Sequence, residues 1–471
     1  MAAEAVRPDR TPRPWTLDDA ERASAATIVR RGRATAFARV TTDTRAITGG
    51  ELFVALAGER HDAHNFAAAA VTAGATGLVV ARDVTLPDDA DVTVLRVADT
   101  LTALQSLAAD LRQRVAPTVL ALTGSNGKTT TKEMLAAILV AAAGSDAVLK
   151  TQGNLNNLIG VPLTLLGLSG SERYAVIEMG MNAPGEIRRL TAIADPDVGI
   201  ITNVGPAHLE GLGSVEGVAR AKGELFATMR PTATAIVNVE DPHVAGLGAA
   251  FAGRVVRFGA GTDVAADGIR CDARGAAAFT LHLGGDAIDV QLQIPGRHNV
   301  MNALAAAAAA TAVGVPPKAV RAGLHAATSV GGRMRVVPLA SGVTIVDDSY
   351  NANPASVAAA LRSLADAPAT RRIAVLGDML ELGAASVEQH RQVGMLAGTV
   401  GLTALYLHGD FAADTARGAA TTMAADAIHV ASDHATIARA LSADTRRGDW
   451  ILVKGSRGQR MEEVVRLLGA P

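Results

Sequence analysis

One short segment near residue 120 constrains the fold of this chain more than any other. Residues 118–122 form an apolar run with β-branched side chains, and a helix with an apolar face begins at about Lys128. The loop Gly-Ser-Asn-Gly at residues 124–127 joins the two. A glycine-rich loop in this position lets backbone N–H groups and the helix N-terminus face a phosphate group. The segment therefore predicts a parallel α/β sheet that binds a nucleotide at one edge.

The side chains of this loop suit the chemistry of ATP and magnesium. Lys128 can reach the β- and γ-phosphates, and the Thr129 hydroxyl can bind Mg²⁺. The loop is short, because Leu122 stands where the general motif has its first glycine, and the chain has no Asn-Lys-x-Asp segment for guanine. A standard GTPase is therefore disfavoured, and the remaining alternative is an ordinary glycine-rich turn. The residues predicted to hold the nucleotide are Gly124, Ser125, Asn126, Gly127, Lys128, Thr129 and Thr130.

The rest of the chain continues the alternation of strands and helices. Its 471 residues correspond to about three domains. We predict an α/β protein with a smaller N-terminal α/β domain, a central phosphate-loop domain with a parallel sheet, and a C-terminal Rossmann-like domain. A hairpin is predicted around Gly284 and Gly285, between two alternating runs. The predicted domain boundaries are 1–115, 116–330 and 331–471.

Composition excludes several classes of protein. The formal net charge of −2 lacks the basic excess of a general nucleic-acid binder. The single cysteine, Cys271, rules out an intramolecular disulfide and fits a reducing compartment. The alanine-rich stretch 303–315 is too short to span a membrane, and the N-terminus has no apolar signal region. We therefore expect a cytoplasmic protein that neither binds nucleic acid nor inserts into a membrane. A monomer is also expected, although composition does not bear on the oligomeric state.

Several further motifs accompany the phosphate loop, and together they resemble one family, the Mur ligases. The resemblance covers nearly the whole chain except the first dozen or so residues. The loop alone is shared with folylpolyglutamate synthases, whereas the motifs at 347–354 and 376–383 are more specific. The matching segments are T-G-S-N-G-K-T-T (123–130), G-N-L-N-N-L-I-G-V-P (153–162), I-E-M-G (177–180), T-N-V-G-P-A-H-L (202–209), G-R-H-N-V-M-N-A-L-A-A (296–306), G-G-R-M (331–334), D-D-S-Y-N-A-N-P (347–354), L-G-D-M-L-E-L-G (376–383) and K-G-S-R-G (454–458).

The resemblance implies an ATP-dependent amide-bond ligase of peptidoglycan synthesis, with roles in cell-wall biogenesis, cell shape and cell division. Its substrates would be UDP-N-acetylmuramoyl-tripeptide and D-alanyl-D-alanine. ATP would phosphorylate the terminal carboxylate of the tripeptide, and the dipeptide amine would attack the acyl phosphate. Two alternatives stay open: another Mur-type or folylpolyglutamate-type amide ligase, and a P-loop nucleotide switch without ligase chemistry.

The resemblance also implies a metal site. Glu178, His208 and Lys222 would join Thr129 in binding Mg²⁺, with Lys222 carbamylated so that a cation becomes a long carboxylate. With Lys128, these three would be the catalytic residues. Position alone also favours a role for Glu178, because a carboxylate at the C-terminal end of a parallel strand points into the ligand crevice, and an exposed strand-end glutamate is the alternative. The alternatives for the other two are a solvated loop histidine at His208 and a solvated helix lysine at Lys222.

The remaining site residues are also carried over from the resemblance. Arg333 would reach across a domain boundary to phosphate, and Asp347 would contact the ribose or orient the base; an asparagine-rich turn before a helix is the alternative for its motif. The predicted ATP contacts are Asn299, Arg333, Asp347 and Tyr350. The first domain would bind the uridine nucleotide through Thr44, Arg45 and Arg60. Asn154 and Asn157 would line the peptide or the phosphate side of the cleft. The further substrate contacts would be Asn351, Lys454, Ser456 and Arg457, the last three facing the incoming peptide.

Overall fold

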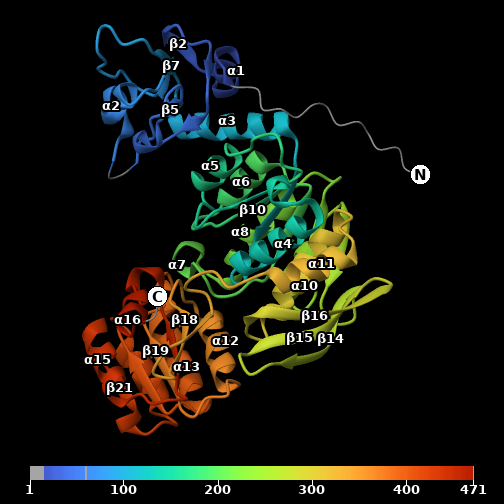
Figure 1. Cartoon of the computed structure of the whole chain (residues 1–471), viewed down its shortest axis with the longest axis vertical. Helices are drawn as coiled ribbons and strands as arrows, with labels where there is room; N and C mark the ends of the chain where they lie inside the picture. The colour runs from blue at the N-terminus through green and yellow to red at the C-terminus, as the bar shows by residue number, and fades with distance from the viewer. Residues whose placement is uncertain (1–14, 59–60, 470–471) are drawn as a thin grey trace.

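The computed structural model of the chain describes residues 15–58 and 61–469. Within these ranges the strands form a five-stranded, a nine-stranded and a six-stranded sheet, and one further pair. The three α/β units built on these sheets follow one another in the order of the sequence, from top to bottom in Figure 1. The predicted α/β fold class is confirmed.

The N-terminal unit has a sheet of order β2-β7-β6-β5-β4, in which only β2 runs antiparallel to its neighbour. The separate pair, β1 with β3, is antiparallel. The elements of the N-terminal unit are β1 (Trp15–Thr16), α1 (Leu17–Ser24), β2 (Thr27–Arg30), β3 (Ala36–Phe37), β4 (Val40–Thr41), η1 (Thr44–Ala46), β5 (Leu52–Val54), η2 (Ala63–Phe66), α2 (Ala67–Thr72), β6 (Gly77–Val80), β7 (Thr93–Arg96) and α3 (Thr100–Val115).

The last helix of this unit, α3, also packs on the central unit. Its apolar side chains, such as Leu107, share one buried cluster with Ile187 and Leu190 of α6. The Nε of Arg112 donates a hydrogen bond of 2.9 Å to the Ala194 carbonyl. The helix ends at Val115, and the chain turns into the next strand through Ala116 in a left-handed conformation (φ 49°). Helix α3 therefore anchors the N-terminal sheet to the central unit, as Figure 1 shows.

The central sheet has the order β16-β15-β14-β13-β12-β11-β8-β10-β9. It is parallel from β9 to β14 and antiparallel across β14, β15 and β16. Its elements are β8 (Thr118–Thr123), α4 (Lys128–Ala143), η3 (Ser145–Ala147), β9 (Val148–Lys150), α5 (Gly160–Leu165), β10 (Tyr174–Glu178), α6 (Glu186–Ala194), β11 (Val198–Ile201), α7 (Leu209–Leu212), α8 (Val215–Thr228), β12 (Thr234–Asn238), α9 (Pro242–Ala249), β13 (Arg254–Phe258), β14 (Val264–Cys271), β15 (Ala276–Leu283), β16 (Asp286–Pro295), α10 (Asn299–Ala312) and α11 (Pro317–Ala326).

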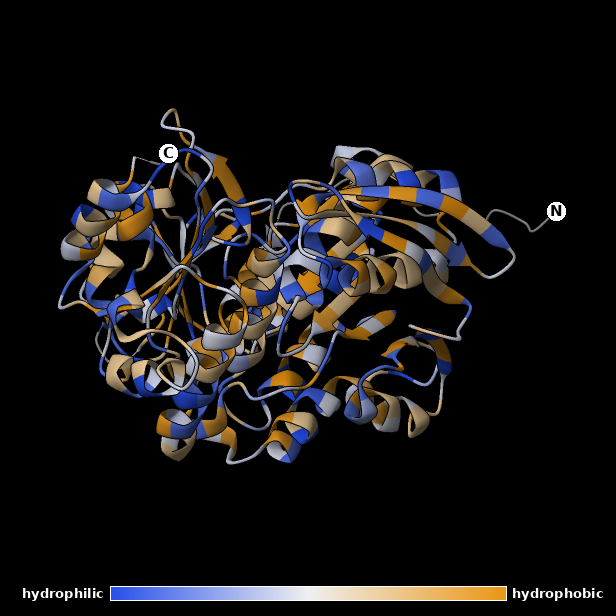
Figure 2. Cartoon of the chain, turned by 90° about the horizontal axis from the view of Figure 1, so that it is seen from below, coloured by the Kyte–Doolittle hydropathy of each residue, from blue (hydrophilic) through white to orange (hydrophobic). Residues whose placement is uncertain are grey.

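The predicted hairpin is confirmed, since Leu283 of β15 pairs with Asp286 of β16 across Gly284 and Gly285. Along β15, buried and half-buried residues alternate over most of its length, and the hairpin strands carry alternating hydrophobic and hydrophilic colours in Figure 2. One face of the hairpin packs on alanine-rich α10, which is buried over most of its length. Small side chains allow this close packing, which explains the alanine run at 303–310.

The C-terminal sheet has the order β17-β18-β22-β19-β20-β21 and is parallel except for β17. This sheet has strand β17 at one edge. Its elements are β17 (Arg335–Pro338), β18 (Thr344–Asp348), α12 (Pro354–Ala365), β19 (Arg372–Leu376), η4 (Gly383–Ala385), α13 (Ser386–Thr399), β20 (Ala404–Leu407), α14 (Ala412–Ala419), η5 (Ala425–Ala427), β21 (Ile428–Val430), α15 (His434–Asp444), β22 (Trp450–Lys454), η6 (Arg457–Gln459) and α16 (Glu462–Leu467).

The order of the strands in the central sheet determines where the candidate site lies. Strands β11, β8 and β10 are neighbours in the central sheet and run parallel, so their carboxyl ends meet at one edge. The phosphate loop follows β8, Glu178 ends β10, and Thr202 follows β11. In open α/β sheets this edge is where ligands bind. Among residues 15–58 and 61–469, no helix combines the length and hydrophobicity needed to cross a membrane.

Candidate active site

Two glycines shape the phosphate loop. Gly124 and Gly127 have φ values of +154° and +78°, which side chains rarely adopt. A Cβ atom on Gly124 would lie 1.9 Å from Thr202 Oγ1, and one on Gly127 would lie 2.1 Å from Asn302 Oδ1. The loop is therefore pressed against two polar side chains that leave no room for anything larger than glycine.

Neighbouring loops hold this loop in place. The Thr202 hydroxyl donates to the Asn126 carbonyl at 2.6 Å, and the Asn126 N–H donates to Asn203 Oδ1 at 2.9 Å. Asn302 in turn donates from Nδ2 to Asn299 Oδ1 at 2.8 Å, and Asn299 donates to the Pro295 carbonyl at 2.6 Å. These hydrogen bonds hold the phosphate loop in one conformation without a nucleotide, and such preorganisation favours binding of an anion.

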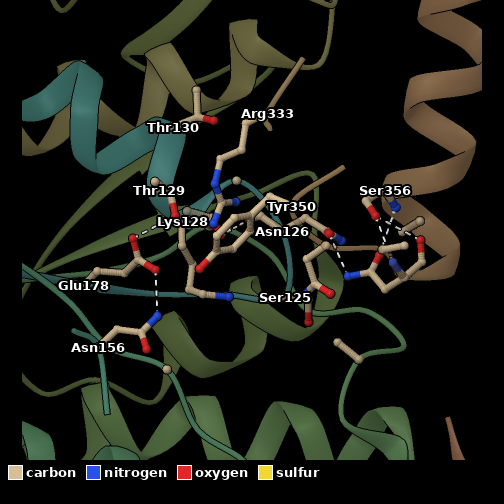
Figure 3. Close-up of a pocket in the computed structure, with 18 of the residues that line it drawn as sticks. Ser125, Asn126, Lys128, Thr129, Thr130, Asn156, Glu178, Arg333, Tyr350 and Ser356 are labelled. Atoms are coloured by element: carbon tan, nitrogen blue, oxygen red, sulfur yellow. Dashed lines mark hydrogen bonds between the residues drawn. The ribbon is translucent and has the colours of Figure 1, made fainter. Parts of the chain in front are cut away.

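Lys128 begins α4 and turns back over the loop. Its Nζ donates to the Gly124 carbonyl at 2.7 Å. Burial, the largest effect, lowers the pKa of this ammonium; nearby Glu178 opposes the shift and nearby Arg333 adds to it. Figure 3 shows the Arg333 side chain extending toward Lys128. Two cations therefore converge beside the phosphate loop, an arrangement suited to a polyanionic ligand.

Glu178 ends β10 and is almost fully buried, at 2% exposure. The Thr129 hydroxyl donates to its Oε2 at 2.9 Å, and Asn156 Nδ2 donates to its Oε1 at 2.9 Å (Figure 3). A hydroxyl and a carboxylate thus meet beside Lys128. Oxygen donors of this kind are the ligands that Mg²⁺ prefers.

His208 lies just before α7 with a left-handed backbone (φ 55°). Its Nδ1 is 2.6 Å from Glu381 Oε2, a carboxylate of the C-terminal unit. This contact, the largest influence, lowers the pKa of Glu381. The histidine therefore faces the central site while its ring contacts a residue of another unit.

Lys222 lies in α8 at 1% exposure. Across the described part of the chain, no hydrogen bond or ion pair to its Nζ is found. Burial, with a further contribution from the charge of Lys128, holds the pKa of Lys222 well below its ordinary value. Burial favours the neutral form of an amine, and the neutral form is the nucleophilic one.

The C-terminal unit covers the phosphate loop from the other side. The Arg333 guanidinium stacks on the Tyr350 ring at 4.1 Å, and Arg457 lies 5.7 Å from the same ring. Lys454 donates to Asp348 Oδ2 at 2.6 Å and to the Asn351 carbonyl at 2.8 Å, and both ionic groups are buried. The C-terminal unit therefore presents cations and amides toward the phosphate loop.

Most of these groups line one cavity of about 890 Å³ between the central and C-terminal units. Its wall joins the phosphate loop and the ends of β10 and β11 to the loop before β17 and to the loops after β18, β19 and β22. The lining includes Lys128, Glu178, His208, Arg333 and Lys454. A polar cavity with this mixture of cations, carboxylates and hydroxyls suits phosphoryl transfer to or from an anionic substrate.

Two family models match the chain. Residues 122–310 match the Mur ligase middle domain, and residues 332–457 match the Mur ligase, glutamate ligase domain. The UDP-N-acetylmuramoyl-tripeptide–D-alanyl-D-alanine ligase of Escherichia coli (strain K12) is 44% identical, covering 91% of this chain and 93% of that protein. The chain belongs to the Mur ligase family. It is therefore a ligase.

Other relatives and solved structures agree with this membership. The ligase of the same name from Mycobacterium tuberculosis (strain H37Rv) is 37% identical, covering 91% of both chains. MurF from Acinetobacter baumannii superposes with a TM-score of 0.88 at 36% identity, covering 96% of this Mur ligase and 98% of that chain. The MurF ligase from Thermotoga maritima in complex with ADP gives 0.80 at 30% identity, covering 91% and 96%. Folylpolyglutamate synthase of M. tuberculosis, at 18% identity and a TM-score of 0.63, shares the fold alone.

The cavity of this Mur ligase brings together most of the residues predicted from the sequence. Lining residues come from the nucleotide, metal and peptide predictions alike. They are Ser125, Asn126, Gly127, Lys128, Thr129, Thr130, Asn154, Asn157, Glu178, His208, Asn299, Arg333, Tyr350, Asn351, Lys454, Ser456 and Arg457. Their roles toward ligands stay predictions.

Three predicted residues near the cavity do not line it. Gly124, the first residue of the phosphate loop, packs against Thr202, and Lys222 is buried in α8. Asp347 accepts hydrogen bonds from the Ser349 hydroxyl at 2.6 Å and from the Gly332 N–H at 3.2 Å. Its neighbour Asp348 lines the cavity instead. In this arrangement Asp347 holds the two loops that carry Arg333 and Tyr350.

The predicted uridine-binding residues lie apart from this cavity, on the N-terminal unit. Thr44 begins η1, and Arg45 donates to both carboxylate oxygens of Asp43, at 2.9 and 2.7 Å. The Arg45 side chain is 88% exposed. Arg60 lies outside the described residues. Thr44 and Arg45 are thus on an accessible surface of a separate unit.

Sequence reasoning missed several residues that build the site. Asn156, Asn203 and Asn302 position Glu178 and the phosphate loop, and Glu381 contacts His208. All four lie in or beside the quoted motifs. The available signal was the abundance of asparagine and glutamate in those motifs, which did not indicate which side chain faces which partner.

Proposed function

We propose that this Mur ligase uses ATP to join D-alanyl-D-alanine to UDP-N-acetylmuramoyl-tripeptide, giving the UDP-muramoyl-pentapeptide precursor of peptidoglycan. Relatives named for these two substrates are 36–44% identical over about nine-tenths of the chain. The observation that carries the proposal is the single cavity in which the phosphate loop faces Arg333, Tyr350 and Lys454 of the C-terminal unit.

The first step activates a carboxylate, which by itself is a poor electrophile. An oxygen of the tripeptide carboxylate attacks the γ-phosphorus of ATP, the bond from that phosphorus to the bridging oxygen breaks, and ADP leaves. Both reactants are anions, so their approach needs positive charge nearby. Lys128 and Arg333 supply it from opposite units, and the N–H groups of the phosphate loop bind the phosphate oxygens.

The second step forms the amide bond. The dipeptide amine attacks the acyl carbon, the carbon–oxygen bond to phosphate breaks, and the amine releases its proton as phosphate leaves. Lys454, Ser456 and Arg457 end or follow β22 and face the cavity opposite the phosphate loop. Asn154 and Asn157 line the same cavity from the central unit. We assign these residues to the peptide substrates.

The residues around Glu178 suit a magnesium ion. Thr129 and Glu178 offer hard oxygen donors in contact with each other, and His208 lines the same cavity. When bound, Mg²⁺ would neutralise charge on the phosphate oxygens. Among the residues that the structure describes, no three His, Cys, Asp or Glu side chains cluster as a metal site. A carbamate on Lys222 would add the further carboxylate, and its buried amine with a lowered pKa is suited to react with CO₂.

The remaining assignments complete the proposal. The N-terminal unit would bind the uridine nucleotide through Thr44, Arg45 and Arg60. Residues 1–115, 116–330 and 331–471 would act as three domains of a cytoplasmic monomer, whose product serves cell-wall synthesis during growth and division.

The test is ADP release by the purified chain, measured with ATP, Mg²⁺ and the UDP-linked tripeptide. We expect ADP and pentapeptide in equal amounts when D-alanyl-D-alanine is added, and little ADP without it. ADP release that ignores both substrates would identify a nucleotide hydrolase or switch instead. Glutamate addition to a folate, in a parallel reaction, would identify a folylpolyglutamate-type ligase.

A further inference from the structure

The motif L-G-D-M-L-E-L-G at 376–383 has no role in the reaction described above, yet its loop is held at several points. The Met379 N–H donates to His390 Nε2 at 2.9 Å, and the Leu380 N–H donates to Ser456 Oγ at 2.8 Å. Asp378 accepts N–H groups from Asp410 at 2.7 Å and Phe411 at 3.1 Å. The loop between β19 and α13 is therefore fixed within the C-terminal unit.

This fixed loop projects Glu381 onto the central unit. The Glu210 N–H donates to the Glu381 carbonyl at 3.1 Å, and a Cβ atom on Gly383 would lie 3.3 Å from Glu210 Cα. The Glu381 carboxylate then reaches His208, with 2.6 Å between Oε2 and Nδ1. The backbone of Glu381 thus contacts Glu210, and its side chain contacts His208. One residue of the C-terminal unit therefore touches both ends of the segment 208–210 of the central unit.

Backbone conformation supports a specific role. His208 and Glu381 have φ values of 55° and 64°, in the left-handed region. A residue with a side chain in this region costs about 1 kcal/mol or more, so its surroundings must hold it there. Both residues of the contact adopt this conformation, and their side chains meet where the two units touch.

The contact leaves one edge of the histidine free. Nδ1 of His208 is buried, whereas the side chain as a whole is 24% exposed and lines the cavity. The contact uses Nδ1, so the other ring nitrogen, Nε2, takes no part in it. Histidines that bind metals commonly direct their other ring nitrogen to a carboxylate, which fixes the ring and its tautomer.

We propose that Glu381 is a positioning residue for His208: it reaches across from the C-terminal unit, occupies Nδ1 and holds Nε2 toward the cavity. This inference rests on the proposed function for the metal role of His208. Because Glu381 belongs to the C-terminal unit, it can hold His208 in place for the metal only when that unit lies against the central unit. Closure of the two units would therefore be coupled to magnesium binding.

The test compares Glu381→Ala and Glu381→Gln with a control, Glu388→Ala, which removes an exposed carboxylate from α13 of the same unit. Mn²⁺ serves as the probe, and free Mn²⁺ is followed by electron paramagnetic resonance in the presence of a non-hydrolysable ATP analogue. We expect Glu381→Ala to weaken Mn²⁺ binding at least tenfold, the usual range for losing such a partner of a metal-binding histidine. Glu381→Gln keeps the length of the side chain and should recover part of the loss, and Glu388→Ala should behave as wild type.

Two further measurements separate positioning from a general structural effect. The Mg²⁺ concentration for half-maximal ligase rate should rise in Glu381→Ala, while the KM for the UDP-linked substrate stays unchanged. In a His208→Asn background, Glu381→Ala should cause less than a twofold further loss of Mn²⁺ affinity. Unchanged Mn²⁺ affinity in both Glu381 variants would overturn the inference. Absence of D-alanyl-D-alanine-dependent ADP release by wild type would instead overturn the proposed function, since Mn²⁺ binding needs no turnover.

Discussion

Asn353 Nδ2 donates a hydrogen bond of 2.8 Å to Asn126 Oδ1, joining the start of α12 in the C-terminal unit to the phosphate loop of the central unit. The same asparagine caps α12, because its Oδ1 accepts the Ser356 N–H at 2.9 Å and its own N–H donates to Ser356 Oγ at 3.0 Å. Figure 3 shows these bonds side by side. A helix cap of one unit therefore fixes its position relative to the phosphate loop of the other.

Asn353→Ser should separate the two tasks of this residue. Serine caps helices about as well as asparagine, but it is too short to reach Asn126. We expect unchanged stability and an ATP-analogue affinity lowered about fivefold, corresponding to one hydrogen bond of about 1 kcal/mol. Asn353→Ala should also lose about 1 kcal/mol of stability with the cap. Urea unfolding measures the stability of each variant, and calorimetric titration measures its affinity for the ATP analogue. A serine variant that binds the analogue like wild type would show that the hydrogen bond from Asn353 to Asn126 does not support nucleotide binding.

Lys128→Ala should abolish turnover while the fold survives. The Lys128 ammonium is partly buried and, among the contacts found in the described residues, is bonded only to the Gly124 carbonyl, so its loss removes little that stabilises the protein. Losing one charge that stabilises the transferring phosphoryl group costs about 3 kcal/mol or more, a loss of at least about 100-fold in rate. Lys318→Ala, on the exposed face of α11, is the control. Near-normal turnover in a folded Lys128→Ala protein would contradict the assignment.

Arg333 should link nucleotide binding to closure of the two units. Its guanidinium stacks on Tyr350 and is close enough to lower the pKa of Lys128, so a phosphate placed between these cations would draw the units together. Small-angle scattering should show a smaller radius of gyration with an ATP analogue and the UDP-linked tripeptide. Arg333→Ala should reduce this change, whereas Tyr350→Phe, which keeps the ring, should not. Full compaction in Arg333→Ala would show that the arginine has no part in closure.

Local patterns in the sequence were sufficient for the elements around the phosphate loop. Residues 118–122 and 174–178 have the apolar composition of buried parallel strands, and the structure has β8 and β10 there. Glu178 could be placed at a strand end for the same reason. Strand β17 was not predicted, because a short antiparallel edge strand that ends at Pro338 lacks the apolar run of a buried strand.

Side-chain direction and contacts between units could not be predicted in the same way. Adjacent strand residues face opposite sides, so Asp347 and Asp348 have different surroundings, and the run Val-Thr-Ile-Val-Asp-Asp does not indicate which aspartate faces the cavity. The contact of His208 with Glu381 depends on how two units pack against each other. No local periodicity in the sequence encodes that arrangement.

Lys222→Ala should lose ligase activity that a small carboxylic acid can partly restore. If the amine carries a carbamate, the alanine variant lacks two oxygens that acetate or formate can supply. Lys222→Arg keeps a cation where an anion is needed and should gain nothing from either acid. The measurement is ligase rate against acetate and formate concentration for both variants, together with a carbamate signal from ¹³C-labelled bicarbonate in wild type. Wild-type activity in Lys222→Arg would show that no carbamate on Lys222 is needed and that the residue has a structural role.

Glu51 provides a test of stability against pH in the unit that we assign to the uridine nucleotide. Its buried carboxylate accepts the Thr48 N–H at 3.0 Å, the Thr48 hydroxyl at 2.8 Å and the Gly49 N–H at 2.8 Å, which fixes the segment after Thr44 and Arg45. Burial alone would raise the pKa of Glu51, but these hydrogen bonds outweigh it and lower the pKa to about 2. The folded chain therefore loses the Glu51 proton at a lower pH than the unfolded chain, in which the pKa of a glutamate is about 4.3.

Glu51→Gln should therefore destabilise the protein in a pH-dependent way. The stabilisation from the ionised carboxylate is fully present above a pH of about 4.3 and is lost as the pH falls through about 2, the folded-state pKa of Glu51. We expect Glu51→Gln to lower the free energy of unfolding by about 2–3 kcal/mol at pH 7, and by clearly less at pH 3. Glu388→Gln, an exposed control on α13, should change little at either pH. Urea unfolding at both pH values decides the matter, since an effect of equal size at pH 7 and pH 3 would mean that packing, and not ionisation, explains the loss.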